Sequence, residues 1–254
     1  MVTVFASDMR LLAVFAHPDD ESFGVGGTLA KYAAGGARVA LICATRGEGG
    51  LVGDPPLCRP EELGRLREDE LRAACAVLGI RTVRLLGCLD GQVSACANSS
   101  LGARLAEAVR ELRPQVVLTF GPDGISGHPD HVAVGAATRK AISLAADAGW
   151  VPPGVNGISR PWAGARLYYV VRSRATAACC GGPATDSDEA AATARVDVGR
   201  HIETKLRAMR CHRSQPQPFT DLPERELRER LRWELFRLAE PARARKIEPE
   251  SDLF

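Results

Sequence analysis

Short, largely apolar runs that alternate with helical patterns constrain the fold of this chain more than any other feature of its sequence. The runs are residues 11–16, 37–44, 81–86, 115–120 and 166–172. A continuous apolar run of this length is typical of a strand buried on both faces of a parallel sheet. Helical patterns separate the runs, at about 27–35, 60–78, 99–112 and 131–147. This alternation predicts parallel strands joined by helical crossovers.

We therefore expect an α/β fold: a Rossmann-like, mostly parallel sheet with helices on both faces, formed by a single domain over residues 1–254. Its core spans about 10–215, and a further helical segment is expected at 222–240. In such sheets, ligands bind beyond the carboxyl ends of the strands. The loops that begin near residues 17, 45, 87 and 121 should therefore share one rim. The Ala-, Gly- and Cys-rich stretch 173–192 is expected to be a surface loop without an assigned role.

The composition argues against several classes of protein. The 254 residues carry a formal net charge of +2 with arginine and glutamate interleaved, so neither a nucleic acid nor a membrane is expected as a partner. No apolar run approaches the ~20 residues that span a bilayer, and the first residues lack the pattern of a signal peptide. The eight cysteines include no C-x-x-C pair. We expect a reduced, cytoplasmic protein; a homo-oligomer is compatible with the sequence, which does not specify one.

The first strand runs directly into His17-Pro18-Asp19-Asp20-Glu21. Three carboxylates within five residues repel one another unless a cation lies between them, and zinc accepts both imidazole nitrogen and carboxylate oxygen. His17 and Asp20, three residues apart, could reach one ion and leave Asp19 free to act on a water molecule. The alternative is a plain turn that caps a helix, with proline for the bend and aspartate for the free N–H groups.

The glycines in Gly24-Val25-Gly26-Gly27 suggest a nucleotide-binding loop, but their spacing does not support one. The dinucleotide fingerprint needs a third glycine where this chain has Leu29, and it should follow the strand immediately. We expect these glycines to let the backbone pass close to the site and to begin the next helix.

A second cluster, His128-Pro129-Asp130-His131, follows the fourth apolar run and a Gly-rich loop. Its two imidazoles lie three residues apart at a predicted helix start, so they should face the same side. One would complete the metal site, and the other would hold a developing oxyanion. Because the fold brings the ends of separate strands to one rim, the two clusters together indicate a metal-dependent hydrolase. By contrast, His201 and His212 are interpreted as a partly exposed helix residue and a helix C-cap.

These residues resemble the motifs of the PIG-L/LmbE-like deacetylases. The first cluster with Gly26-Gly27-Thr28, the segment Thr45-Arg46-Gly47-Glu48 and the second cluster occur in the order of the family's motifs. The family's Lys-x-x-Ala-x-x-x-His-x-Ser-Gln signature is matched by Lys205, Ala208, His212, Ser214 and Gln215. The resemblance thus extends from about residue 10 to residue 215. It implies a zinc-dependent enzyme that removes an acyl group, often N-acetyl, from an amino-sugar conjugate.

The resemblance also implies a role for each residue of the site. His17, Asp20 and His131 would bind the metal, and Asp19 would be the general base. His128 would stabilise the oxyanion, oriented and kept protonated by Asp130. The sugar would be bound by Arg67, Asp90 and Glu48. The metal would be zinc (Zn2+), although Fe2+ also suits histidine and carboxylate ligands.

Two departures from the family patterns bear on the substrate. Mycothiol-conjugate amidases carry a lysine shortly after the first motif, whereas this chain reads Ser22-Phe23-Gly24-Val25. Bacillithiol-type enzymes usually read His-Pro-Asp-Asp-Val-Glu, and the valine is absent here. Neither departure identifies the substrate. The alternatives are an amidase for a larger glycopeptide or thiol conjugate, a nucleotide-binding module without catalysis, and a noncatalytic scaffold.

Overall fold

One seven-stranded sheet organises the residues that the computed structural model describes, namely 8–96, 100–152, 160–173, 189–217, 222–239 and 250–254. The strands are β1 (Arg10–Phe15), β2 (Arg38–Cys43), β3 (Thr82–Leu85), β4 (Val116–Phe120), β5 (Arg166–Val171), β6 (Ala194–Asp197) and β7 (Trp233–Leu238). They lie in the order β3-β2-β1-β4-β5-β7-β6. Strands β1 to β5 pair in parallel, and β7 runs antiparallel to both β5 and β6. The expected mostly parallel sheet is confirmed.

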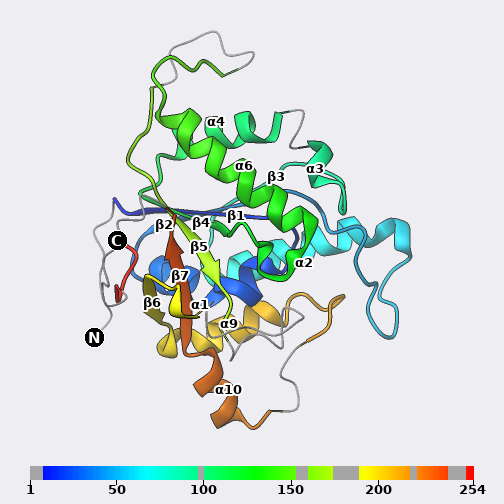
Figure 1. Cartoon of the computed structure of the whole chain (residues 1–254). Coiled ribbons are helices and arrows are strands. Elements are labelled where there is room, and N and C mark those ends of the chain that lie inside the picture. Colours follow the sequence, from blue (N-terminus) through cyan, green and yellow to red (C-terminus); the bar gives the residue numbers. More distant parts are fainter. Residues whose placement is uncertain (1–7, 97–99, 153–159, 174–188, 218–221, 240–249) are drawn as a thin grey trace.

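Helices cover both faces of this sheet, as predicted (Figure 1). They are α1 (Asp20–Ala34), α2 (Leu63–Leu78), α3 (Val93–Cys96), α4 (Gly102–Leu112), α5 (Gly124–Gly127), α6 (Pro129–Ala146), α9 (Ile202–Met209) and α10 (Glu224–Leu231). Helices α4 and α6 pack together on one face, whereas α1, α2 and α9 pack together on the other. Within the described residues, no helix is both long enough and apolar enough to cross a bilayer.

The central strands β1 and β4 position the site. All five residues of β4 are buried, as are five of the six in β1, because helices cover them on both sides. The two strands are neighbours and parallel, so their carboxyl ends deliver the first and second sequence clusters to the same edge. Helix α6 begins there, with His128 as its N-cap and Pro129 in its first turn.

The prediction of a helical segment over 222–240 is correct only for the first part of that range. The helix α10 ends at Leu231, and residues Trp233–Leu238 form β7. Glu234 and Phe236 of this strand are buried, which fits the alternation of a strand. The short strand β6 was not expected, and residues 174–188 of the predicted 173–192 loop lie outside the described residues. Pairing with β5 and β6 decides the strand conformation of β7, because a six-residue segment has too weak a local preference.

The expectation of fully reduced cysteines is also wrong. Cys88 and Cys96 form a disulfide across a separation of eight residues, with their Cα atoms 5.8 Å apart. Four other described cysteines have free thiols, namely Cys43, Cys58, Cys75 and Cys211. The spacing of the bonded pair matches no familiar motif, so only the path of the loop between β3 and α3 reveals the bond.

Candidate active site

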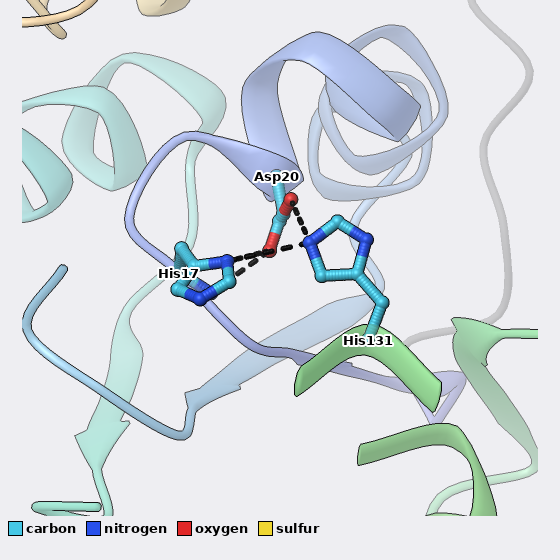
Figure 2. Close-up of side chains that lie close together, drawn as sticks. All are labelled: His17, Asp20 and His131. Carbon is cyan, nitrogen blue, oxygen red and sulfur yellow. Dashed lines mark hydrogen bonds and ion pairs between the residues drawn. The ribbon is translucent and has the colours of Figure 1, made fainter. Parts of the chain in front are cut away.

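Three side chains from the two clusters converge at the carboxyl ends of β1 and β4. Asp20 lies between the imidazoles of His17 and His131 (Figure 2). Its Oδ2 is 3.8 Å from Nδ1 of His17, and its Oδ1 is 3.4 Å from Nε2 of His131. The two imidazole nitrogens are 3.3 Å apart. These three ligand-type side chains, which we call the ligand wall, are the predicted metal ligands and could hold one ion.

A second group of potential ligands shares His17 with the first, and consists of His17, His128 and Asp130. This group fits a cation less well because both carboxylate oxygens of the fully buried Asp130 already accept backbone hydrogen bonds. Gly91 N–H donates to Oδ2 at 2.7 Å, and Val93 N–H donates to Oδ1 at 3.1 Å. The ligand wall is the better metal site, because in the described residues its carboxylate, Asp20, accepts a backbone N–H group on Oδ2 alone. Its two imidazoles and one carboxylate are a common donor set of catalytic zinc.

The protonation of His17 is consistent with a cation site. Burial by itself would lower the pKa of His17, but a hydrogen bond with Asp90 and the charges of Asp20 and Asp90 raise this pKa to about 9. Without a metal, the proton on the ring thus offsets the surrounding negative charge. A bound cation would take over this role and displace a proton, as metal binding to histidine requires.

Asp19 stands beside the ligand wall in a strained backbone conformation. Its φ of 124° lies in the region that favours glycine, and such strain clusters at functional sites. The Asp19 carbonyl accepts the N–H groups of Ser22 and Phe23, which begins α1 and helps to hold this conformation. Arg67 donates to Oδ2 of Asp19 at 2.8 Å. Burial and the charge of Asp20 raise the pKa of Asp19 to about 7, against the opposing charge of Arg67. A carboxylate with such a pKa is suited to general-base chemistry.

Arg67, one of the predicted sugar-binding residues, anchors the loop that contains Asp19 through hydrogen bonds. Its side chain is buried and also donates to the carbonyls of Gly47 at 2.8 Å and Pro18 at 2.5 Å. Gly47 has a φ of 67°, and a Cβ there would collide with the guanidinium. The glycine in the Thr45-Arg46-Gly47-Glu48 motif is therefore required by the close approach of Arg67.

The other two predicted sugar-binding residues contact each other. The Asp90 N–H donates to Oε1 of Glu48 at 3.0 Å. Asp90 lines the pocket, and its Oδ1 is 3.0 Å from Nε2 of His17, which lowers the pKa of Asp90 to about 2. Glu48 is not among the lining residues, and its Oε2 is buried without a partner in the described part of the chain. Glu48 thus supports the loop that presents Asp90.

His128 also reaches the pocket, but its surroundings differ from those expected. The Asp130 carboxylate contacts His17 at 3.2 Å rather than His128, and only the Asp130 backbone N–H donates to Nδ1 of His128. Burial, together with the charges of His131 and His17, lowers the pKa of His128. The charge of Asp130 raises this pKa, but burial and the neighbouring imidazoles outweigh it, so the structure does not support the prediction that Asp130 keeps His128 protonated. A neutral His128 with Nδ1 as acceptor still carries a proton on Nε2 for donation.

Sequence reasoning missed the role of His212, which was interpreted as a helix C-cap. His212 is fully buried, and its Nε2 lies 2.8 Å from Oε1 of Glu21. Burial raises the pKa of Glu21 and lowers that of His212, but attraction within the pair reverses both shifts. The other oxygen of Glu21 accepts the Asp19 N–H at 3.0 Å. The pair therefore braces the strained Asp19, and the family signature that includes His212 was the available signal.

The pocket above these residues has a volume of about 420 Å³. Its apolar side was not predicted and includes Phe15, Phe120 and Val170. Phe120 stacks on the His131 ring with centroids 3.9 Å apart and planes 5° from parallel, which fixes that imidazole. Three glycines and a glutamine also line the pocket, and we call these four residues the recognition rim, namely Gly24, Gly49, Gly50 and Gln215.

The site and the sheet agree with a known family. The family described as PIG-L, GlcNAc-PI de-N-acetylase, matches residues 12–142, which include both clusters. The 1D-myo-inositol 2-acetamido-2-deoxy-alpha-D-glucopyranoside deacetylase of Thermobispora bispora is 35% identical over 247 residues, and the match covers 82% of this chain and 80% of the relative. The chain belongs to the PIG-L family.

Solved structures show the same fold. The conserved protein TT1542 from Thermus thermophilus has a TM-score of 0.66 and 27% identity, and the match covers 92% of this chain and 95% of the other. The N,N'-diacetylchitobiose deacetylase from Pyrococcus horikoshii has a TM-score of 0.67 and 22% identity, with coverage of 91% and 83%. At that identity the second likeness concerns the fold alone.

Proposed function

We propose that this chain is a divalent-metal-dependent N-deacetylase that hydrolyses the acetamide of a 2-acetamido-2-deoxyglucose joined to inositol. The observation that carries the proposal is the convergence of His17, Asp20 and His131 beside the strained Asp19 at one pocket. Family membership supports the reaction, and the activity for which the Thermobispora relative is named supports the substrate. The pocket volume of about 420 Å³ suits a ligand of this size.

The ligand wall would hold the metal, and zinc suits two imidazoles and one carboxylate. When bound, such a cation acts as a Lewis acid, making water nucleophilic near neutral pH and polarising the amide carbonyl. Asp19 would accept the proton of the attacking water, because Arg67 engages only its Oδ2. The same carboxyl group could then return the proton to the leaving amine. His128 would donate a hydrogen bond from Nε2 to the oxygen that becomes negative.

The sugar would lie against the recognition rim, with Asp90 as a hydrogen-bond acceptor for its hydroxyl groups. Asp90 is the predicted sugar-binding residue whose carboxylate lines the pocket and keeps partial exposure. In this proposal Arg67 and Glu48 act on the sugar indirectly. Arg67 positions Asp19, and Glu48 positions Asp90. We keep the cytoplasm as the proposed location of this small-molecule enzyme, although the Cys88–Cys96 disulfide is of a kind that is rare there.

The test is an amine-release assay on the purified, zinc-loaded protein. Its substrates are 2-acetamido-2-deoxyglucosyl-inositol, free N-acetylglucosamine, and a larger N-acyl glycopeptide. We expect the inositol conjugate to give the highest kcat/KM and a chelator to abolish turnover reversibly. Preference for the glycopeptide would favour the amidase alternative, and no amine release from any of the three would reject the deacetylase.

A further inference from the structure

Two carboxylates meet the side of the His17 ring that faces away from Asp20. The Oδ1 of Asp90 and the Oδ2 of Asp130 lie 3.0 Å and 3.2 Å from Nε2. The other ring nitrogen, Nδ1, faces Asp20 and His131 (Figure 2). One imidazole is thus held between the ligand wall on one side and two acidic groups on the other.

Asp130 is held rigidly in this arrangement. Its side chain is fully buried, and its two oxygens accept the N–H groups of Gly91 and Val93. The oxygen that faces His17 is the one that accepts the Gly91 N–H. Because both oxygens are fixed by backbone, Asp130 can turn away from His17 only if this backbone moves.

Asp90 is held more loosely, on the surface of the pocket. Its Oδ2 accepts the N–H of Gly49 at 3.0 Å, a bond made at the exposed recognition rim. A substrate hydroxyl that binds Asp90 would compete with His17 for the same carboxylate. Asp130 therefore provides the constant contact with His17, and Asp90 provides one that substrate can modify.

Three residues that make these contacts lie in one segment, whose ends are joined by a disulfide. Asp90, Gly91 and Val93 all lie between Cys88 and Cys96, which the disulfide joins. The Cys88 N–H also donates to the carbonyl of Ala44 at 2.9 Å, just beyond the end of β2. The segment is thus tied to the sheet at its start and closed on itself at its end.

We propose that residues 88–96 position the metal ligand His17, and we call this segment the buttress. It acts through two positioning residues, its own Asp90 and Asp130, which its backbone holds. The carboxylates hold the proton of the ring on Nε2 and leave Nδ1 as the metal-binding nitrogen. Carboxylate partners of this kind fix the tautomer and raise the basicity of a ligating histidine. The inference rests on the proposed metal site, and it gives Asp130 a different role from the orientation of His128 expected at first.

Zinc affinity measured by competition with a chromogenic chelator tests the buttress without any substrate. We expect Asp130→Asn to weaken zinc binding by about 10- to 100-fold, the usual cost of losing such a partner. Asp90→Asn should have a smaller effect in the same direction. Asp69→Asn, which changes an exposed aspartate on α2, is the matched control and should leave the affinity unchanged.

A second pair of variants covers the case in which Asp130→Asn does not fold. The double variant Cys88→Ser/Cys96→Ser opens the segment without touching either carboxylate, and it should also weaken zinc binding. Cys58→Ser removes a free thiol outside the segment and is its control. Full zinc affinity in a folded Asp130→Asn, or in the double cysteine variant, would overturn the buttress.

The tautomer of His17 provides a readout that a merely structural role would not change. In zinc-loaded protein labelled with 15N-histidine, we expect the proton on Nε2 and the metal on Nδ1. The opposite arrangement would place the ion at the second group, with His128 and Asp130, and would refute the proposal. If the parent protein binds no zinc, the proposed metal site itself fails. Deacetylation with unchanged affinity in Asp130→Asn would refute only the buttress.

Discussion

The ligand wall and the recognition rim are built in opposite ways, although they enclose the same pocket. Each side chain of the ligand wall is held by a neighbour: carboxylates at His17, a backbone N–H at Asp20 and a stacked ring at His131. The recognition rim carries three glycines and continues into Leu51, which is 59% exposed. The rim is held mainly through its backbone, since the Gly49 N–H donates to Asp90 and the Gly50 N–H donates to the Gly47 carbonyl.

This difference separates the residues that would carry out the reaction from those that would bind the substrate. Catalytic groups must be held close to their reactive geometry, because small displacements cost large factors in rate. The rim offers mostly backbone to a substrate, and its link to the ligand wall is indirect, through the bond from Gly49 to Asp90, which contacts His17. Substitutions in the ligand wall should therefore affect the reaction itself, whereas substitutions at the rim should affect substrate affinity.

The largest expected effect separates metal binding from base catalysis. His17→Ala should lose both zinc and turnover, because it removes a ligand. Asp19→Ala should retain zinc but lose turnover by about 10²- to 10⁴-fold, the usual contribution of a general base. Zinc content by elemental analysis and kcat by amine release measure the two effects. An Asp19→Ala variant as active as the parent protein would remove Asp19 from the mechanism.

A smaller loss is expected at His128, which donates a hydrogen bond but holds no metal. His128→Ala should lower kcat by about 10²- to 10³-fold with little change in KM, as for other oxyanion donors. His128→Gln should recover part of the loss, because a neutral amide can also donate. Steady-state kinetics of both variants check this. Equal kcat values for the two would argue against a neutral donor at this position.

The Glu21–His212 pair should stabilise the fold within a limited range of pH. The raised pKa of His212 stabilises the fold below its ordinary value of 6.5, and this contribution is lost as the pH rises through the folded value. The lowered pKa of Glu21 stabilises above its ordinary value of 4.5, and that contribution is lost as the pH falls. His212→Gln should therefore cost about 3 kcal/mol near pH 6, and less once the pH exceeds the raised pKa of His212.

Urea unfolding at several pH values measures this difference. His201→Gln is the control, since burial and the charges of Lys31 and Arg200 lower the pKa of His201 and give the opposite pH dependence. A cost for His212→Gln that grows toward alkaline pH would contradict the charged pair.

The smallest effects are expected from two glycines in α1. A Cβ on Gly27 would come within 2.6 Å of Val198, so Gly27→Ala should destabilise the fold by about 1–3 kcal/mol. A Cβ on Gly24, at the recognition rim, meets nothing within 4 Å. Gly24→Ala should therefore be tolerated, with a gain below about 1 kcal/mol because α1 is kinked at the adjacent Val25, and should change mainly KM. Thermal unfolding and kinetics of both variants test whether the rim tolerates side chains; an unfolded Gly24→Ala would show that it does not.

The sequence predicted the elements whose signal is local. Continuous apolar runs marked β1, β2 and β4, and the clusters at their ends marked all three side chains of the ligand wall. It failed for β7 and for the Cys88–Cys96 bond, where partners distant in sequence or the path of a loop decide the outcome. The same holds for His212, whose partner Glu21 lies 191 residues away.

The chemistry available to this protein is already written in its sequence, because histidine and aspartate at two strand ends form a donor set suited to a metal. How those groups are used depends on the folded chain. It assigned Asp130 to His17 rather than to His128, and Arg67 to Asp19. A hydrogen bond forms only where two side chains meet in space. These meeting points are set by the packing of three segments around the sheet, namely α6, α2 and residues 88–96.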